Sequence, residues 1–332
     1  MNPPDPTPLF DMSVAFWRSG ALFAALELNL FNTLSNDAKS AESLAAELNV
    51  PLRTLDMLLE ALAALDLVES EDGTYRNGPL ATTFLTAASP AYLGDTILFN
   101  ARAWNAWGDL STSVRDNTPG VPPETFLGKD PAATQEFVMG MHHRALGVAR
   151  CMLSLIDLSN VSTLLDIGGG PATYARLLTE RYESLRVTVL DVPAVIDVAA
   201  TLIADSTARD RITLQPGSMF TDSLGSDFDA VLFSGVLHRT EGDDTVKLLQ
   251  KAADALKPRG QVFISDVFTG SDNQGPVLPE LFSLQMMLIS DQGRSLKLPE
   301  IAELCQAAGL ELQSKVPYPA PLPHTLCVAV KL

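Results

Sequence analysis

The segment Ser162–Thr173 constrains the fold of this chain more than any other stretch. A buried strand is predicted by three closely spaced apolar residues, Leu164, Leu165 and Ile167. Asp166 lies near the carboxyl end of this strand. Gly168 and Gly170 follow at once and allow the backbone to turn sharply and to approach a ligand closely. The N–H groups of the helix predicted next favour an anionic or carboxylate-bearing partner. The segment therefore predicts either a ligand-binding strand–turn–helix unit or a tight turn without a ligand.

The spacing of the glycines favours one kind of cofactor turn over another. A dinucleotide fingerprint requires glycine at the sixth position counted from Gly168, and Thr173 occupies that position. The pattern from Asp166 through Gly170 to Ala172 is instead similar to the nucleoside-binding turn of S-adenosylmethionine (SAM) methyltransferases. This similarity makes Asp166, Gly168 and Gly170 candidate cofactor-binding residues.

The charge balance of the chain limits its partners. The chain has 332 residues, a formal net charge of −17 and 46% apolar residues, which is enough for two domains with sizeable cores. The negative charge argues against a nucleic-acid partner and against an anionic membrane surface, because both require clustered Lys and Arg. We find neither a basic signal-peptide region nor an apolar run of about 18 residues, so we expect a soluble cytoplasmic protein. Its three widely spaced cysteines are expected to be free thiols.

The first 90 residues predict a winged-helix-like domain. We expect a helix over 12–34, a second after the capping residue Ser40, a third over 52–67, and a hairpin over 68–76. Winged helices often bind DNA, but residues 1–90 hold four basic residues against twelve acidic ones. We therefore assign them to a dimerisation or lid domain. The first helix, apolar on several sides, is expected to pack against another subunit or within the chain.

Alternating strands and helices predict the fold of the remaining chain. Residues 91–150 are expected to be a helical linker and pocket segment, and residues 151–332 a catalytic domain. Strands are predicted at 163–167, 186–190, 211–214, 229–234 and 260–265, with closing strands at 311–316 and 324–331. The fold class is α/β: a doubly wound, mostly parallel, seven-stranded Rossmann-like sheet, which binds ligands at the carboxyl ends of its strands.

Further candidate cofactor residues follow the later strands. Asp191 ends the second strand, 21 residues after Gly170, where a carboxylate can accept hydrogen bonds from both ribose hydroxyls or merely cap the loop. Ser218, Met219 and Phe220 follow the third strand, and the last two can enclose an adenine ring. Ser234 ends the fourth strand and completes the cofactor set.

His238 is the candidate catalytic base. It lies just past the fourth strand, and a histidine there can take a proton from a bound hydroxyl. The alternative is a structural histidine whose nitrogens are satisfied by partners. Asp266 ends the fifth strand at the same sheet edge and can orient or electrostatically support His238.

Nearly the whole chain resembles the O-methyltransferase family that includes plant caffeate-type enzymes and bacterial antibiotic and pigment methyltransferases. The resemblance is carried by five motifs: Leu165–Gly170, Leu190–Ile196, Gly217–Phe220, Val236–His238 and Leu256–Gly260. It implies SAM as cofactor, methyl transfer to a hydroxyl, and a homodimer that interlocks through the N-terminal domains. His238 matches the family's general base, Asp191 its ribose ligand, and Met219 a residue that flanks the adenine.

The chain departs from the family pattern at three places. Ser218 stands where the family has an aspartate, and Arg239-Thr240 replaces the usual Asp-Trp after the base. Ser295 aligns with the second carboxylate that flanks the base, whereas Asp266 matches the first. His238 is therefore expected to act with one supporting carboxylate instead of two.

The acceptor pocket is expected between the sheet edge and the helical segments. Apolar pockets with few polar groups suit aromatic or polyketide-like molecules, although each of these side chains can also be ordinary core packing. The candidates are Trp104, Trp107, Phe126, Met141, His142, Phe282, Met286 and Met287.

Three other functions remain open from the sequence. A SAM-binding relative can methylate carbon or nitrogen, or support hydroxylation, and the departures at Arg239, Thr240 and Ser295 leave this possible. A winged-helix regulator is disfavoured by the acidic charge. Metal-dependent methyl transfer would require a carboxylate cluster, and we identify no metal ligands in the sequence.

Overall fold

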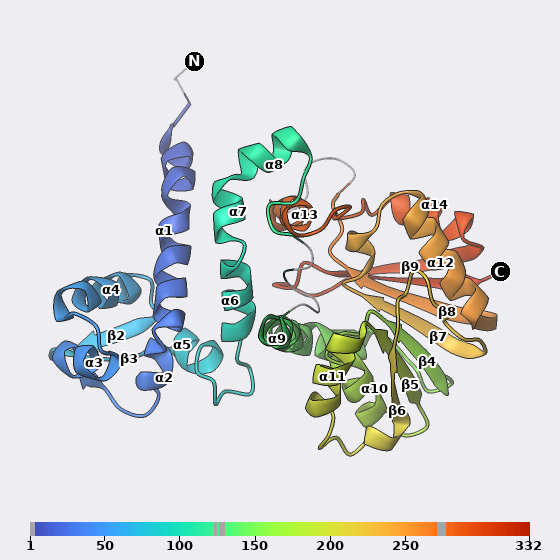
Figure 1. Cartoon of the computed structure of the whole chain (residues 1–332), viewed down its shortest axis with the longest axis horizontal. Coiled ribbons are helices and arrows are strands. Elements are labelled where there is room, and N and C mark those ends of the chain that lie inside the picture. Colours follow the sequence, from blue (N-terminus) through green and yellow to red (C-terminus); the bar gives the residue numbers. More distant parts are fainter. Residues whose placement is uncertain (1–3, 123–124, 126–129, 271–276) are drawn as a thin grey trace. The chain divides into compact units, whose positions relative to one another are not determined.

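The computed structural model describes residues 4–122, 125, 130–270 and 277–332, which form two compact units (Figure 1). The first unit spans residues 1–102 and the second spans residues 103–332. The predicted acceptor residue Phe126 lies outside the described residues.

The first helix of the N-terminal unit ends earlier in the chain than the sequence predicted. Helix α1 runs from Thr7 to Glu27 and a short helix α2 from Leu30 to Thr33, so the predicted helix 12–34 is wrong as one continuous element. The break lies at Asn29, whose φ of 58° is left-handed. Asparagine tolerates this conformation better than most residues, so it ends the helix without a glycine.

The winged-helix prediction is confirmed in its local details. Ser40 caps α3 (Ala41–Leu48), because its hydroxyl oxygen accepts a 3.3 Å hydrogen bond from the Ser43 N–H. Helix α4 (Leu52–Ala64) precedes a hairpin of β2 (Val68–Glu71) and β3 (Thr74–Asn77), which β1 (Lys39–Ser40) extends in the order β1-β3-β2. Asp72 and Gly73 both have positive φ, as a tight hairpin turn requires. Helices α5 (Pro79–Phe84) and α6 (Gly94–Ala101) complete the unit.

Helix α1 presents a large apolar surface. Its five large exposed apolar side chains are 53–68% exposed: Leu9, Phe10, Met12, Phe16 and Trp17. By length and composition α1 could also cross a membrane. This corrects the expectation that the chain has no apolar run long enough to span a bilayer. Core helices of soluble proteins and signal sequences meet the same criterion of length and composition. The core of the unit lies instead beneath α2, α3 and α4.

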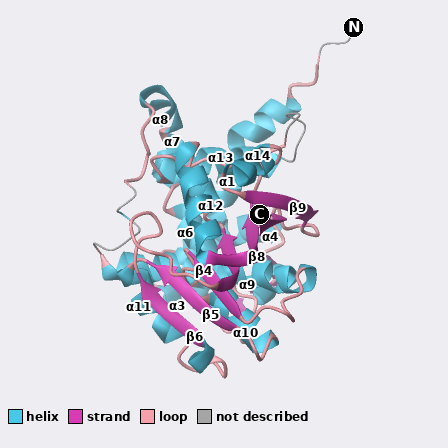
Figure 2. Ribbon diagram, turned by 90° about the vertical axis from the view of Figure 1, so that its right-hand side faces the viewer, coloured by secondary structure: helices cyan, strands magenta, loops and turns pink. Residues whose placement is uncertain are grey.

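The second unit is built on a seven-stranded sheet with the order β6-β5-β4-β7-β8-β10-β9 (Figure 2). The first five strands are parallel, and β10 pairs antiparallel with both β8 and β9. The strands are β4 (Thr163–Ile167), β5 (Arg186–Asp191), β6 (Ile212–Pro216), β7 (Phe228–Ser234), β8 (Leu256–Asp266), β9 (Leu310–Pro317) and β10 (Thr325–Lys331). The predicted fold class is therefore confirmed, although β8 begins four residues early.

The two faces of the sheet carry separate apolar cores because side chains alternate along each strand. Leu165 and Ile167 of β4 face α12 (Asp243–Ala255) and α14 (Glu300–Ala307), whereas Leu164 faces the opposite side. That side is covered by α9 (Pro131–Leu155), α10 (Thr173–Arg181) and α11 (Pro193–Leu202), in green to yellow in Figure 1.

The remaining elements of the second unit are mostly short helices. They are α7 (Trp104–Gly108), α8 (Leu110–Asp116), α13 (Val277–Ile289) and the 3-10 turns η2 (Arg209–Arg211) and η3 (Leu237–Arg239). All three cysteines are free, as predicted: Cys151, Cys305 and Cys327.

Candidate active site

The sheet places the candidate residues along one edge. The strand order reverses between β4 and β7, because β5 and β6 lie on one side of β4 and β7 and β8 on the other. Such a switch point leaves a crevice at the carboxyl ends of the strands. Asp166, Asp191, Ser234 and Asp266 lie at the ends of β4, β5, β7 and β8, so strand geometry brings them to this edge.

The glycine turn after β4 has no room for side chains at its first two glycines. Gly168 has a φ of 66°, and a Cβ there would approach Val236 Cγ2 to 2.8 Å. A Cβ on Gly169 would lie 2.7 Å from Asp166 Oδ2. Tight packing therefore requires glycine at these two positions, and the close approach of a ligand to the turn stays a prediction.

Asp166 is a buried carboxylate without a hydrogen-bond partner. It is 1% exposed, and neither side-chain oxygen has a partner among the described residues. Burial, with the nearby Asp191 charge, raises the pKa of Asp166 to about 7. Buried carboxylates normally find donors, so these oxygens are suited to donors or a cation of a bound cofactor.

Asp191 is ordered by the backbone of the turn. Its Oδ2 accepts a 2.8 Å hydrogen bond from the Gly170 N–H, and its Oδ1 accepts one of 2.7 Å from the Val192 N–H. Burial raises the pKa of Asp191, an effect that these bonds and the charge of Arg239 partly offset. Arg239, a departure from the family motif, thus acts electrostatically on the predicted ribose carboxylate.

The loop after β6 is held by a residue that the sequence reading missed. Lys251 of α12 donates hydrogen bonds of 2.8–2.9 Å to the carbonyl oxygens of Met219, Phe220 and Asp222. The Ser218 hydroxyl accepts from the Phe220 N–H at 3.3 Å, so it serves the loop's own turn. Met219 is half-buried, whereas Phe220 is 51% exposed.

Ser234 lies beside a buried phenol. The pKa of Tyr174, at the start of α10, is raised by burial, and a hydrogen bond with Ser234 opposes the rise. Both side chains therefore belong to one polar contact between β7 and α10, at the edge where Asp166 ends β4.

His238 and Asp266 form a close polar pair at the sheet edge. His238 Nδ1 lies 2.8 Å from Asp266 Oδ1, and the His238 backbone N–H donates to Oδ2 at 3.3 Å. Burial alone would raise the pKa of Asp266, but His238 and the Val267 N–H outweigh it and keep that pKa low. A charged carboxylate at Nδ1 favours the tautomer with its proton on Nδ1, which leaves Nε2 able to accept a proton.

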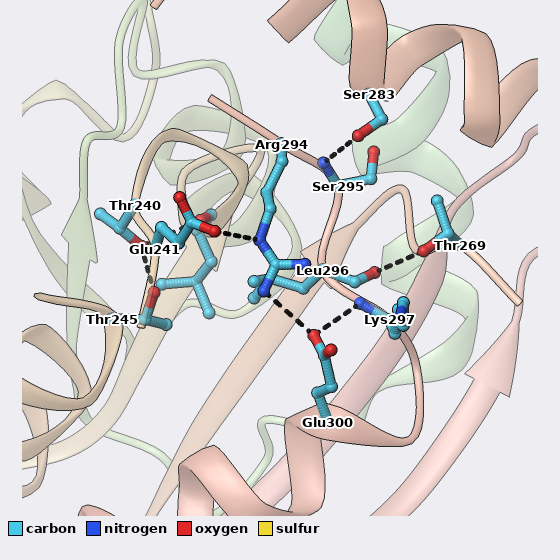
Figure 3. Close-up of polar contacts among 11 residues, drawn as sticks. Thr240, Glu241, Thr245, Thr269, Ser283, Arg294, Ser295, Leu296, Lys297 and Glu300 are labelled. Carbon is cyan, nitrogen blue, oxygen red and sulfur yellow. Dashed lines mark hydrogen bonds and ion pairs between the residues drawn. The ribbon is translucent and has the colours of Figure 1, made fainter. Parts of the chain in front are cut away.

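The loop that should supply a second carboxylate is turned to other partners (Figure 3). The buried Ser295 N–H donates to Ser283 Oγ at 3.2 Å, and its hydroxyl lies 3.5 Å from the Pro279 carbonyl. The preceding Arg294 forms ion pairs with Glu241 at 3.2 Å and Glu300 at 3.3 Å (Figure 3). The backbone N–H of Arg294 donates to the backbone carbonyl oxygen of His238 at 2.9 Å. The loop thus braces the His238 backbone and adds no carboxylate.

Helix α13 carries three predicted acceptor residues and places one of them, Phe282, beside the base. The Phe282 ring stands edge-on to His238, with centroids 5.2 Å apart. The Trp107 indole donates to Gln285 Oε1 at 2.5 Å, which ties α7 to the same helix. Met286 is buried and Met287 half-buried on α13.

The other acceptor candidates lie elsewhere. His142 Nδ1 is 2.8 Å from Thr173 Oγ1 at the start of α10, and burial first, then His143 and Arg176, lower the pKa of His142 to about 4. Met141 is half-buried, and Trp104 is 40% exposed. Within the described ranges no group of three or more His, Cys, Asp or Glu could hold a metal ion.

The fold and this edge define a class I, Rossmann-like enzyme of the type that binds a nucleoside cofactor at a strand switch point. The chain belongs to the O-methyltransferase family. Residues 107–311 match the model of the O-methyltransferase domain, and residues 10–87 match that of the O-methyltransferase dimerisation domain.

Individual relatives cover nearly the full length. A 3-hydroxy-5-methyl-1-naphthoate 3-O-methyltransferase of Streptomyces sahachiroi is 31% identical over 98% of this chain and 95% of its own. A tetracenomycin polyketide synthesis 8-O-methyl transferase of Streptomyces glaucescens is 29% identical over 92% and 91%. The structure of human N-acetylserotonin methyltransferase in complex with SAM superposes with a TM-score of 0.88 at 25% identity, covering 100% and 99%.

Proposed function

We propose that this O-methyltransferase uses SAM to methylate a hydroxyl of a small aromatic or polyketide-like molecule, with His238 as general base. The observation that carries the proposal is the 2.8 Å His238–Asp266 pair at the sheet edge that also holds Asp166 and Asp191. The two Streptomyces relatives, named for a naphthoate and a polyketide, support this acceptor class.

The cofactor end of the site fits SAM. The partnerless Asp166 oxygens suit a positively charged or N–H-bearing group, and Asp191 is oriented to accept from vicinal hydroxyls. Gly168 and Gly170 let the backbone approach, while Ser218, Met219, Phe220 and Ser234 complete the cofactor set. When bound, SAM supplies an electrophilic methyl group on a sulfonium.

The chain's own contribution to the reaction is alignment and one proton transfer. His238 Nε2 takes the proton of the acceptor hydroxyl, and Asp266 stabilises the imidazolium that results. Phe282 and Met286 of α13 exclude water and hold the ring in line for displacement. With one supporting carboxylate, the base suits hydroxyls that are themselves acidic.

We further propose a homodimer in a soluble, cytoplasmic protein. All the exposed apolar side chains of α1 except Leu9 lie within the matched dimerisation domain, so a second copy of this domain is the partner that their burial requires. The three-part division at residues 90 and 150 stays a prediction, with 91–150 as the pocket segment. Partners other than the acceptor, including nucleic acid and membrane, are not part of the proposal.

Two measurements test this function in sequence. Calorimetry with S-adenosylhomocysteine should show binding, and a panel of phenols, naphthols and hydroxyquinones should then gain one methyl mass from SAM. Absence of cofactor binding would contradict the whole proposal. Binding without methyl transfer to oxygen, but with transfer to carbon or nitrogen, would leave the cofactor site and overturn the hydroxyl acceptor.

A further inference from the structure

A half-buried cation lies beside the proposed acceptor site. Arg144 is a half-buried residue of α9, and its guanidinium carbon lies 5.3 Å from the centroid of the Phe282 ring. The same ring stands edge-on to His238 at 5.2 Å. One aromatic ring therefore separates this positive charge from the proposed base.

The guanidinium has no anionic partner in the described part of the chain, where it forms neither a hydrogen bond nor an ion pair. Asp266 acts on it only as a charge, because the carboxylate oxygens already accept from the His238 ring, the His238 N–H and the Val267 N–H. An arginine carries five N–H donors in a planar fork. Leaving such a group partly desolvated and unpaired is costly.

Apart from the charge of Asp266, the neighbouring polar groups do not compensate the charge of Arg144. Burial lowers the pKa of Arg144 and raises that of Tyr174, so the phenol beside it stays neutral. Burial first, then the Arg144 charge, lowers the pKa of His324 to about 4, so His324 is uncharged at neutral pH. Arg144 is thus the cation of this cluster that remains charged and free to bind an anion.

We infer that Arg144 binds a carboxylate carried by the aromatic acceptor, which makes the substrate an aromatic hydroxy acid. Two parallel N–H···O bonds fit a carboxylate to the guanidinium fork, while Phe282 supports the fork from one face. The position beside Phe282 and His238 favours the acceptor over the cofactor as source of the anion. The inference rests on the proposed function, since it names the acceptor of that same site.

The test compares hydroxynaphthoic and hydroxybenzoic acids with their carboxamides, which keep the ring, the hydroxyl and the shape but lack the charge. Binding to the full chain is measured by calorimetry with S-adenosylhomocysteine present, and methyl transfer is measured with SAM. The variants are Arg144→Gln, Arg144→Lys and the control Arg150→Gln, an exposed arginine of the same helix. The wild-type comparison of acid with amide needs no variant and is unaffected by misfolding.

We expect at least one acid to bind the wild-type chain about tenfold to one-hundredfold more tightly than its amide. Arg144→Gln should abolish this preference, Arg144→Lys should keep part of it, and Arg150→Gln should keep all of it. Equal affinity for every acid and its amide, including no binding of either, overturns the inference. An Arg144→Gln variant that keeps the acid preference also overturns the inference, even where that variant has lost affinity for S-adenosylhomocysteine.

The two proposals fail in different ways. Arginine-dependent binding of an acid without methyl transfer upholds the carboxylate site and contradicts the proposed reaction. Efficient methylation of phenols without any preference for acids upholds the reaction and contradicts the role of Arg144.

Discussion

The two ends of the active-site edge differ in the hydrogen-bonding groups that lack a partner: acceptors at one end and donors at the other. At the carboxyl ends of β4 and β5, Asp166 holds two buried oxygens without donors, and Asp191 is a second carboxylate close by. Beside β8 and α13, the half-buried Arg144 holds N–H donors that have no acceptor among the described residues. A cofactor with a cation and hydroxyls complements the first end, and an anionic acceptor complements the second.

The difference also separates binding from chemistry. The cofactor end relies on rigid backbone, because Gly168 and Gly169 leave no room for side chains and the Gly170 N–H orients Asp191. The base end relies more on side chains, through the His238–Asp266 pair and the ring of Phe282, although backbone N–H groups also donate to Asp266. Substitutions at the first end should therefore change cofactor affinity, and those at the second should change turnover or acceptor choice.

The largest effect is expected for His238→Ala. Loss of a general base lowers kcat by about 10²- to 10⁴-fold, whereas affinity for S-adenosylhomocysteine should change little. The rate should recover in part at high pH, because a phenol with a pKa near 10 then ionises without help. Steady-state rates across pH, with calorimetry as control, check this. A variant with wild-type turnover at neutral pH removes His238 from the mechanism.

A smaller, separate effect is expected for Asp191→Asn. Losing the charge on an acceptor of cofactor hydroxyls should weaken S-adenosylhomocysteine binding by about tenfold to one-hundredfold. Turnover at saturating SAM should fall much less. The control is Asp197→Asn, an exposed aspartate on α11. Equal affinity of both variants for the cofactor product would show that Asp191 only caps its loop.

The smallest effect is expected for Asp166→Asn, and it concerns stability without ligand. Because the folded-state pKa is raised from 3.8 to about 7, the folded chain holds this proton more tightly than the unfolded chain. The stability that this group contributes is therefore present at low pH and lost as pH rises through 7.

Thermal unfolding between pH 5 and pH 8 measures this dependence. Asp166→Asn should reduce the fall in Tm with rising pH, and at pH 8 it should exceed the wild-type Tm by roughly 2 °C. The same substitution should weaken binding of S-adenosylhomocysteine. An identical pH slope in both proteins would show that Asp166 does not carry the buried charge.

The prediction from sequence succeeded where local rules decide the structure. The strands from β4 to β10 follow from short apolar runs, and the cap at Ser40 follows from its hydroxyl. The hairpin turn follows from the Asp72-Gly73 pair, and both residues have positive φ in the structure. The prediction of one continuous helix failed at Asn29. The sequence does not show that a polar residue between apolar helix positions will adopt a left-handed conformation. The roles assigned to the site residues stay predictions, although strand ends brought His238 and Asp266 together as expected.

The sequence by itself determined the parallel sheet, the glycine turn and the edge at which the carboxylates meet, because these depend on residues close in the chain and on the rule that parallel strands end together. Only the tertiary structure decided which polar groups find partners. The sequence assigned no role to Arg144 or to Lys251. Packing left the first without an anion and gave the second three carbonyl oxygens, since partners come from segments more than 25 residues away.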